Sequence, residues 1–205
     1  KRVIKVAILN EWIGKDPFAS YQCKIIEPKR VHLTREELKL LETIALPAER
    51  LQKVKDVFLF SCYTGLAYAD VSKLNSQHLH YINGQRWVVL DRTKTKNQSV
   101  IPLLPAAEGI LERYRHQKTL LPIISSQNIN KYLKEVAQLA GITKRLSFHA
   151  ARHTFATTVT LNEGVDIMSV SAMLGHKLLK TTQIYARVNM QKIASDMQKL
   201  NKRGG

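Results

Sequence analysis

The strongest constraint on the fold of this chain is a single β-hairpin signal in a sequence that otherwise has helical periodicity. Residues 79–82 and 86–90 are rich in β-branched and aromatic side chains, and the dipeptide Asn83-Gly84 stands between them. Asn-Gly is a preferred two-residue hairpin turn because both of its positions tolerate positive φ. A third short strand is expected at Val100-Ile101. The sequence therefore predicts one small antiparallel sheet of three strands.

Helical periodicity covers most of the chain on both sides of this sheet. Apolar side chains recur at intervals of three and four residues, and glycine or proline stands where several of these segments end. The expected helices are residues 1–13, about 35–63, 69–74, 106–117, 128–140, 148–163, 167–174 and 181–187. The predicted fold class is therefore mainly α with a small antiparallel three-stranded sheet, an α+β domain.

Two local signals divide the chain into segments. Asp16-Pro17 ends the first helix, since the residue before a proline disfavours the helical region. A polar, basic segment follows, and Thr34 with Glu37 then has the pattern of a capping box at the start of the next helix. We expect residues 1–20 to be the last helix of a truncated preceding domain, 21–32 a linker, 33–190 the main domain and 191–205 a C-terminal helix and tail.

The charge of the chain points to a polyanionic partner. Its 32 Lys and Arg residues outnumber 16 Asp and Glu residues, which gives a formal net charge of +16. Nucleic acid is the first candidate partner for such an excess. The basic surface of a ribosome-associated or membrane-peripheral protein would have the same composition, so charge alone leaves these classes open.

Other compositional features exclude several classes of protein. No apolar run approaches the roughly 18 residues of a membrane span, and no secretory signal is visible. The chain has two cysteines, Cys23 and Cys62, which form no C-x-x-C pair. We therefore expect no disulfide framework and no cysteine-rich zinc site, and a reducing cytoplasm fits this cysteine usage.

The residues that carry chemistry gather in the last third of the chain. His149 and Arg152 stand three apart near the start of a helix, where exposed amides and the helix dipole favour an anion. The Arg152 guanidinium could donate two hydrogen bonds to phosphate oxygens, and His149 could donate another. His176 follows Gly175 at a helix end, and Tyr185 is nine residues further. A phenol has a pKa of about 10, so Tyr185 needs nearby positive charge to act as a nucleophile.

In this order, the residues resemble the C-terminal signature of the tyrosine recombinase (phage integrase) family. The signature reads His149-x-x-Arg152, then Leu174-Gly175-His176, then Tyr185. Taken singly, each residue is compatible with a surface or packing role, whereas the ordered series is specific.

The resemblance extends upstream and covers roughly residues 33–190. Thr64-Gly65-Leu66 and Asp70 match the family's T-G-L-R-x-x-E/D box, and Lys94 matches the lysine on the family's β-hairpin. Residues 63–70 are most similar to those of conjugative-transposon integrases.

This resemblance implies the catalytic-domain fold of a tyrosine recombinase and an enzyme that acts on double-stranded DNA. Such an enzyme is a site-specific recombinase or integrase, which cleaves and rejoins strands through a 3′-phosphotyrosyl intermediate without a metal or other cofactor. No carboxylate cluster that would hold two Mg²⁺ ions is seen in the sequence. The implied location is the bacterial cytoplasm, at the nucleoid.

The resemblance also assigns roles to individual residues. Tyr185 is the nucleophile, Arg152 and His176 hold the non-bridging oxygens, Lys94 protonates the leaving 5′ oxygen, His149 assists in proton transfer or phosphate contact, and Asp70 orients its neighbours. The basic residues expected to contact DNA are Arg92, Lys94, Lys96, Arg145 and Lys177.

One position departs from the family pattern. The family's first catalytic arginine directly follows T-G-L, and here that position is Ala67. Loss of a cation from such a site costs a few kcal/mol of transition-state stabilisation. Arg92 is the candidate substitute, because a strand continuing through residues 90–94 would point Arg92 and Lys94 to the same side. Arg86 and Lys96 are weaker alternatives, and Arg92 could equally be an ordinary contact with the DNA backbone.

Family members act as tetramers that exchange C-terminal segments, so a homo-tetramer on DNA is expected. An apolar stripe at helical spacing, made of Met190, Ile193, Met197 and Leu200, suits this exchange. The same stripe could fold back onto its own domain, although its place beyond Tyr185 favours docking on a neighbour.

Three other functions compete with the recombinase. A catalytically impaired DNA-binding or regulatory protein is suggested by Ala67 and by a resemblance of residues 166–187 to a helix-turn-helix. A type IB topoisomerase uses similar chemistry, but the L-G-H and Tyr185 arrangement argues against it. A structural or protein-interaction domain would leave the charge and the ordered motifs without a cause.

Overall fold

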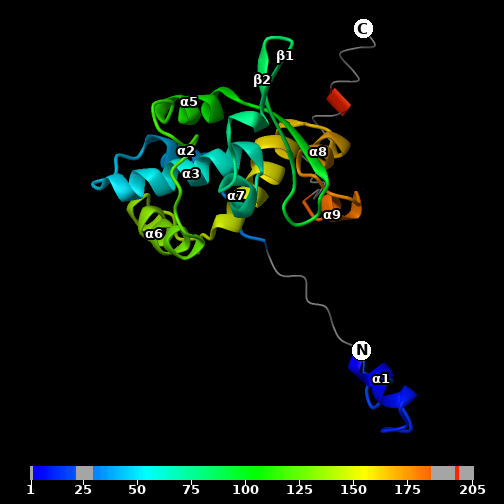
Figure 1. Ribbon diagram of the computed structural model, residues 1–205. Helices are drawn as coiled ribbons and strands as arrows, with labels where there is room; N and C mark the ends of the chain where they lie inside the picture. The colour runs from blue at the N-terminus through cyan, green and yellow to red at the C-terminus, as the bar shows by residue number, and fades with distance from the viewer. Residues whose placement is uncertain (1, 22–29, 186–196, 199–205) are drawn as a thin grey trace.

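Helices are the main secondary structure of the protein in a computed structural model, which describes residues 2–21, 30–185 and 197–198 (Figure 1). The helices are α1 (Arg2–Leu9), α2 (Arg35–Thr43), α3 (Glu49–Thr64), α4 (Tyr68–Val71), α5 (Pro105–Arg113), α6 (Ser126–Leu139), α7 (Phe148–Thr154), α8 (Ile167–Met173) and α9 (Lys180–Gln183). The strands are β1 (Leu79–Ile82), β2 (Gln85–Asp91) and β3 (Gln98–Pro102), and a short 3₁₀ helix, Ser76–His78, precedes β1. The predicted α+β class is therefore confirmed.

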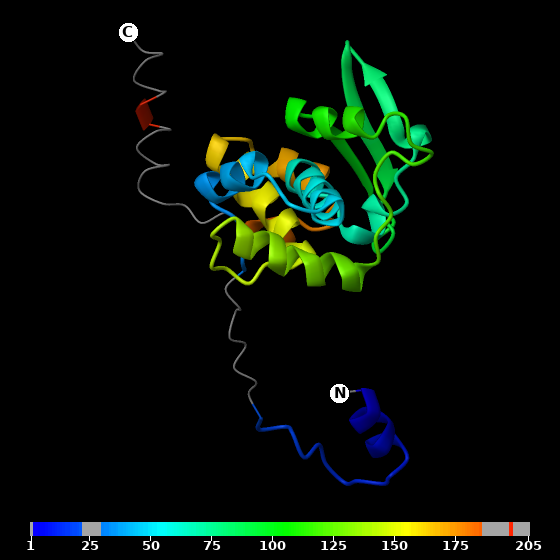
Figure 2. The same cartoon turned by 90° about the vertical axis from the view of Figure 1, so that its left-hand side faces the viewer.

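The sheet has the order β1-β2-β3 and is antiparallel throughout. Asn83 and Gly84 join β1 to β2 with φ values of 52° and 77°, the positive values that a type I′ turn requires. Figures 1 and 2 show this hairpin projecting beyond the helices. Val88 pairs with Ile101 in the register, and both are almost completely buried. The hairpin predicted from the Asn-Gly signal is thus present.

The expected helix over about 35–63 is two helices. Thr34 forms the predicted capping box: its hydroxyl accepts from the Glu37 amide at 3.2 Å, and its own amide donates to the Glu37 carboxylate at 2.7 Å. The chain leaves α2 at Ile44, which has extended backbone angles, and re-enters a helix at Glu49. Pro47 between them explains the break, because proline disfavours the helical conformation of the residue before it.

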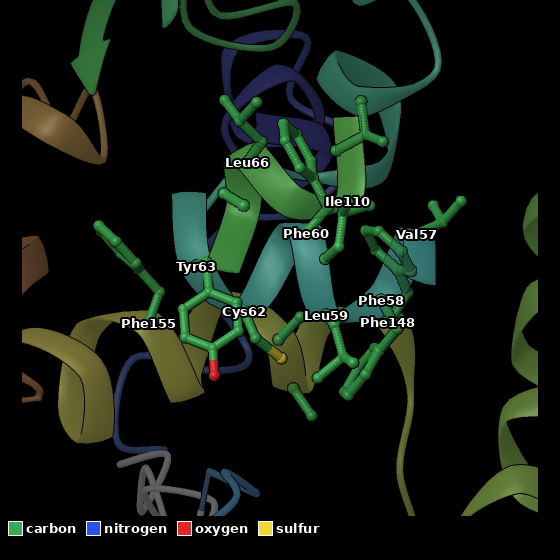
Figure 3. Close-up of a cluster of buried hydrophobic side chains, with 14 of the residues drawn as sticks. Val57, Phe58, Leu59, Phe60, Cys62, Tyr63, Leu66, Ile110, Phe148 and Phe155 are labelled. Carbon is green, nitrogen blue, oxygen red and sulfur yellow. The ribbon is translucent and has the colours of Figure 1, made fainter. Parts of the chain in front are cut away.

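Helix α3 is the centre of the core. Nearly all of its residues from Leu51 to Thr64 are buried, and it packs against α5, α6 and α7. Figure 3 shows Phe58, Phe60 and Tyr63 of α3 among apolar side chains that include Phe148 and Phe155. Burial of each such side chain stabilises the fold by roughly 1.5–3 kcal/mol. This packing fixes the C-terminal end of α3 beside α7.

The segment 148–163 is helical as predicted, but it changes its winding. After α7, residues Phe155–Thr160 form a π-helical stretch and Leu161–Glu163 form a 3₁₀ turn. The Thr160 hydroxyl donates to the Phe155 and Ala156 carbonyls, and the Thr158 hydroxyl donates to the carbonyl of Leu33. Hydroxyls that bond to backbone carbonyls compete with regular helix bonding, so threonine favours such irregular turns. π-Helical turns often occur next to functional sites.

Some sequence predictions fall outside the described residues. These are the central part of the linker, residues 22–29, the end of the last expected helix beyond Tyr185, and the C-terminal stripe except for Met197, which is exposed. Within the described ranges, no helix is both long and apolar enough to cross a membrane.

Candidate active site

Arg152 is held at the centre of the candidate site by two backbone carbonyls. It lies on α7 and is only 6% exposed. Its Nη1 donates to the Gly65 carbonyl at 2.7 Å, and its Nη2 donates to the Leu174 carbonyl at 2.6 Å. Burial lowers the pKa of Arg152 to about 10, and the charge of Arg92 acts in the same direction. Arg152 therefore remains a cation at neutral pH and joins the ends of α3 and α8.

Gly65 makes this approach feasible. It caps α3 with a φ of +69°, which a residue with a side chain adopts at a cost. A Cβ atom there would lie 2.5 Å from Cδ1 of Phe155 and 2.8 Å from Cδ2 of Leu174. The glycine of the T-G-L sequence thus lets its own carbonyl reach Arg152.

Arg92 enters the same site from the end of β2. Its Nη1 donates to the Leu174 carbonyl at 3.0 Å, and its Nε forms an ion pair with Oδ2 of Asp70 at 2.6 Å. The other carboxylate oxygen of Asp70 accepts from the Thr93 amide at 2.9 Å. Burial lowers the pKa of Arg92, and the Asp70 carboxylate opposes this change. Two guanidinium groups therefore converge on one carbonyl, and Asp70 orients one of them.

The strand geometry expected for Arg92 was wrong. β2 ends at Asp91, and residues 92–97 form a turn closed by the Arg92 amide to the Asn97 carbonyl and the Lys96 amide to the Arg92 carbonyl, both at 2.9 Å. Lys96 takes a positive φ of 58° in this turn. As a result, the Arg92 side chain is buried and the Lys94 side chain is exposed.

His176 lies beside Arg152 in the site. Its Nε2 is 2.9 Å from Nη2 of Arg152, and its Nδ1 is 2.7 Å from Oγ1 of Thr182. Because a guanidinium only donates, Nε2 is the acceptor and Nδ1 carries the hydrogen. Burial lowers the pKa of His176 to about 4, and the charges of Arg152 and Arg92 act in the same direction. His176 is therefore neutral at pH 7.

Tyr185 is buried next to these groups, with 8% of its surface exposed. Its ring lies parallel to that of His176, with the centroids 6.4 Å apart. Its hydroxyl oxygen is 3.1 Å from Nδ1 of His153. Burial raises the pKa of Tyr185, whereas the charges of Arg152, Arg30 and Arg92 lower it. The structure thus brings Tyr185, Arg152 and His176 together, as the motif order predicts.

His153 is a residue of this site that the sequence analysis missed. The motif H-x-x-R ends at Arg152, and His153 is the next residue. The available signal was helical spacing, since His149 and His153 are four residues apart and share a helix face. Their rings lie edge to face, with centroids 4.4 Å apart.

His149 and Ala67 line a pocket of about 370 Å³ beside Arg152. Tyr68 and Asn130 also line it. The His149 side chain is partly exposed, and its remaining burial, together with the charge of Arg152, lowers the pKa of its imidazole. Ala67 stands where the family pattern has an arginine, and the pocket beside it is open space next to the buried Arg152.

Four of the five candidate DNA-binding residues are exposed, and only Arg92 is buried. The exposed ones are Lys94, Lys96, Arg145 and Lys177. Lys94 and Lys96 lie in the turn after β2, which Asn97 links to the Gly175 carbonyl at 3.3 Å. Figure 1 shows this turn beside the α8–α9 segment, which carries Lys177. Arg145 instead lies in the connection between α6 and α7, at a separate pocket of about 350 Å³.

Metal-binding side chains do not cluster in the described part of the chain. Over residues 2–21, 30–185 and 197–198, no group of three or more His, Cys, Asp or Glu side chains is arranged to hold a metal ion.

Solved structures share this fold. A Tn1549 transposon integrase in complex with a circular intermediate DNA superposes with a TM-score of 0.73 at 20% identity, covering 97% of this chain and 76% of that one. A lambda integrase dimer bound to a core site gives a TM-score of 0.71 at 16% identity, covering 92% and 73%. At these identities the likeness establishes the fold alone.

Sequence comparisons find relatives at higher identity than these solved structures. Tyrosine recombinase XerC of Lactobacillus leichmannii is 34% identical over 148 residues, which are 65% of this chain and 50% of that protein. Tyrosine recombinase XerC of Lactobacillus delbrueckii subsp. bulgaricus is 43% identical over 143 residues, 62% and 48% of the two chains. This chain thus spans about half the length of these relatives. The sequence profile of the Phage integrase family matches residues 31–192, from before the capping box to beyond Tyr185. The chain therefore belongs to the phage integrase family.

Proposed function

We propose that this chain is the catalytic part of a site-specific DNA recombinase or integrase that uses Tyr185 as its nucleophile. The observation that carries the proposal is the convergence of two guanidinium groups on the Leu174 carbonyl, with His176 bonded to one of them and the Tyr185 ring parallel to that of His176. Buried cations beside a phenol supply charge neutralisation where a phosphodiester would gain negative charge.

The reaction follows from these groups. The Tyr185 oxygen attacks phosphorus and releases its proton to water as the new bond forms, the bond to the 5′ oxygen breaks, and a 3′-phosphotyrosyl link results. Arg152 and Arg92 neutralise the non-bridging oxygens with His176 beside them, and Lys94 donates a proton to the departing 5′ oxygen. His149, which lines the pocket at Arg152, assists at the phosphate. The link conserves the phosphodiester energy, so rejoining is the reverse step and needs no ATP.

Arg92 takes the place of the missing arginine in this proposal. Its ion pair with Asp70 and its bond to the Leu174 carbonyl aim it at the site from the end of β2. The alternatives fit less well: Arg86 bonds the Tyr81 hydroxyl on the exposed hairpin, and Lys96 points to solvent. A role in ordinary DNA-backbone contact would not require burial of Arg92.

We also propose the binding partner, the oligomeric state and the cellular location of this recombinase. Solved relatives such as the XerH recombinase bound to a difH substrate are DNA complexes, which supports double-stranded DNA as the partner. We propose a homo-tetramer on DNA that exchanges C-terminal segments, acting in the bacterial cytoplasm at the nucleoid, on a mobile element such as a conjugative transposon. Residues 1–20 belong to a core-binding domain, and residues 21–32 link it to the catalytic domain.

A second candidate is a DNA-binding regulator that has lost catalysis. The open pocket at Ala67 favours it, since the family's first arginine is absent there. The two candidates differ in one product, because only a recombinase becomes covalently attached to DNA.

A covalent-trapping assay distinguishes them. The full-length protein is incubated without metal with nicked suicide substrates that carry the end sequences of its DNA element, and the products are separated on a denaturing gel. We expect a shifted band with the wild type and with Tyr81→Phe, an exposed tyrosine on β1, and no band with Tyr185→Phe. If the protein binds DNA but forms no covalent band, the recombinase proposal is wrong and the chain is a DNA-binding regulator.

A further inference from the structure

We infer that His153 is a positioning residue for the nucleophile, which holds the Tyr185 hydroxyl so that its lone pairs face the phosphate. This inference rests on the proposed function. His153 directly follows Arg152 on α7 and is 6% exposed. Its Nδ1 lies 3.1 Å from the Tyr185 hydroxyl, and the two ring centroids are 5.4 Å apart.

The direction of this hydrogen bond follows from the protonation of both groups and from the tautomer of His153. Burial lowers the pKa of His153 to about 4, with His149, Arg30, Arg152 and His32 acting in the same direction, so its imidazole is neutral. Burial raises the pKa of Tyr185, so its phenol keeps its proton. In the tautomer that carries its hydrogen on Nε2, His153 has a free acceptor at Nδ1, and the tyrosine O–H donates to it. With its hydrogen directed at His153, the phenol oxygen has its lone pairs free for attack on phosphorus.

Orientation, rather than removal of the proton, is the role that these groups support. Burial raises the pKa of the Tyr185 phenol and lowers that of the His153 imidazole to about 4, so proton transfer from the phenol to the imidazole is unfavourable. His153 therefore does not deprotonate Tyr185 in the free protein. A hydrogen bond still restricts rotation of the phenol hydroxyl, and a misplacement of about 1 Å in a reacting group can lower a rate by 10²-fold.

The surroundings of the pair make it rigid. The His149 ring lies edge to face against His153, and the His176 ring lies parallel to that of Tyr185. His176 in turn bonds to Arg152 and Thr182. The nucleophile is thus linked to the phosphate-binding arginine through His176 and to helix α7 through His153.

The test compares three substitutions of His153 in the full-length protein. His153→Leu removes the acceptor, His153→Asn places an amide oxygen close to the position of Nδ1, and His153→Gln places its acceptor further out, near the position of Nε2. The readouts are the single-turnover rate of covalent adduct formation on the suicide substrate and the Kd for uncleaved DNA. We expect roughly a 10- to 100-fold slower cleavage for Leu and Gln, recovery to within a few-fold for Asn, and an unchanged Kd.

Two controls separate positioning from other roles. His80→Leu, an exposed histidine on β1, should cleave at the wild-type rate. A substrate with sulfur in place of the scissile 5′ oxygen needs no acid to release its leaving group. It should therefore rescue Lys94→Ala but leave His153→Leu slow.

Each result has one meaning. If the wild type forms no adduct, the proposed function fails. If the wild type forms adduct and His153→Leu does so equally fast, or Asn is as slow as Gln, the positioning role is overturned while the proposed function stands. Thermal melting of each variant identifies loss of folding, and if the leucine variant unfolds, the comparison of Asn with Gln decides.

Discussion

Arg92 and Arg152 donate to the same acceptor, the carbonyl oxygen of Leu174, at 3.0 Å and 2.6 Å. Two guanidinium groups this close repel each other, and Asp70 offsets the repulsion through its ion pair with Arg92. A bound phosphodiester would offset it further, because guanidinium groups form strong charge-assisted bonds with phosphate oxygens. The site therefore has an excess of positive charge that suits an anion.

Substitution of Arg92 tests whether it replaces the family's first arginine. We expect Arg92→Ala to slow covalent cleavage by roughly 10²- to 10³-fold, because one buried cation of an oxyanion site is lost. The measurement is the single-turnover rate of adduct formation. Arg86→Ala, at the exposed hairpin, should stay near the wild-type rate. Equal rates for Arg92→Ala and the wild type would assign Arg92 to DNA-backbone contact only.

Restoration of the family's arginine tests the same idea from the other side. Ala67 lines the pocket of about 370 Å³ next to Arg152, so an arginine at this position has room. We expect the double variant Ala67→Arg, Arg92→Ala to form the covalent adduct at least about tenfold faster than the single variant Arg92→Ala. Failure to recover, in a protein that melts normally, would show that the two positions are not interchangeable.

The parts of the fold that could be predicted are those set by local chemistry. Thr34 with Glu37 specifies a helix start, and Asn83-Gly84 specifies a turn, because short-range hydrogen bonds and positive φ decide both. The order of His149, Arg152, His176 and Tyr185 predicted that the last three meet, since a matching order implies a matching fold.

The parts that could not be predicted depend on tertiary contacts. The turn after Asp91 requires a positive φ at Lys96, which its residue type does not signal. That turn decides that Arg92 is buried and Lys94 exposed, so the strand pattern alone gave the wrong geometry. The partnership of His153 with Tyr185 joins residues 32 apart, and no local pattern marks it.

Gly175 offers a test of how closely the site is packed. It has a φ of +60°, and a Cβ there would lie 2.6 Å from Oγ of Ser99 and 2.8 Å from Cγ of Arg92. We expect Gly175→Ala to lower the free energy of unfolding by about 2–4 kcal/mol and to slow cleavage by displacing Arg92. Gly141→Ala is the matched control, since its φ is +70° with nothing within 4 Å of the added atom.

The two glycine variants are compared by urea denaturation. Gly141→Ala should lower the free energy of unfolding by only about 1 kcal/mol, the cost of a positive φ for alanine, and should keep the wild-type cleavage rate. A Gly175→Ala variant no less stable than Gly141→Ala would contradict the close approach of Arg92.

Salt dependence of DNA binding tests the exposed basic residues. Each lysine or arginine that neutralises a phosphate contributes about 0.9 to the slope of log K against log salt. We expect Lys96→Gln and Lys177→Gln each to flatten this slope by about 1, with Arg145→Gln measured beside them. If a variant has the same slope as the wild type, the replaced residue does not contact a phosphate. Arg145→Gln tests a separate part of the surface, because Arg145 lies between α6 and α7, away from the turn that carries Lys96.

The buried histidines predict how stability changes with pH. Burial lowers the pKa values of His153 and His176 to about 4 in the folded protein, whereas an unfolded histidine titrates near 6.5. The unfolded state therefore binds more protons between these values, and stability falls as pH decreases from about 6.5 towards 4. Each histidine should account for a loss of about 1–2 kcal/mol in the free energy of unfolding between pH 7 and pH 5.

Urea denaturation at both pH values measures this difference in the free energy of unfolding. His153→Asn should reduce the difference by the contribution of one histidine, whereas His80→Asn should leave it unchanged. An identical difference for His153→Asn and the wild type would mean that His153 is protonated as readily in the folded protein as in the unfolded chain.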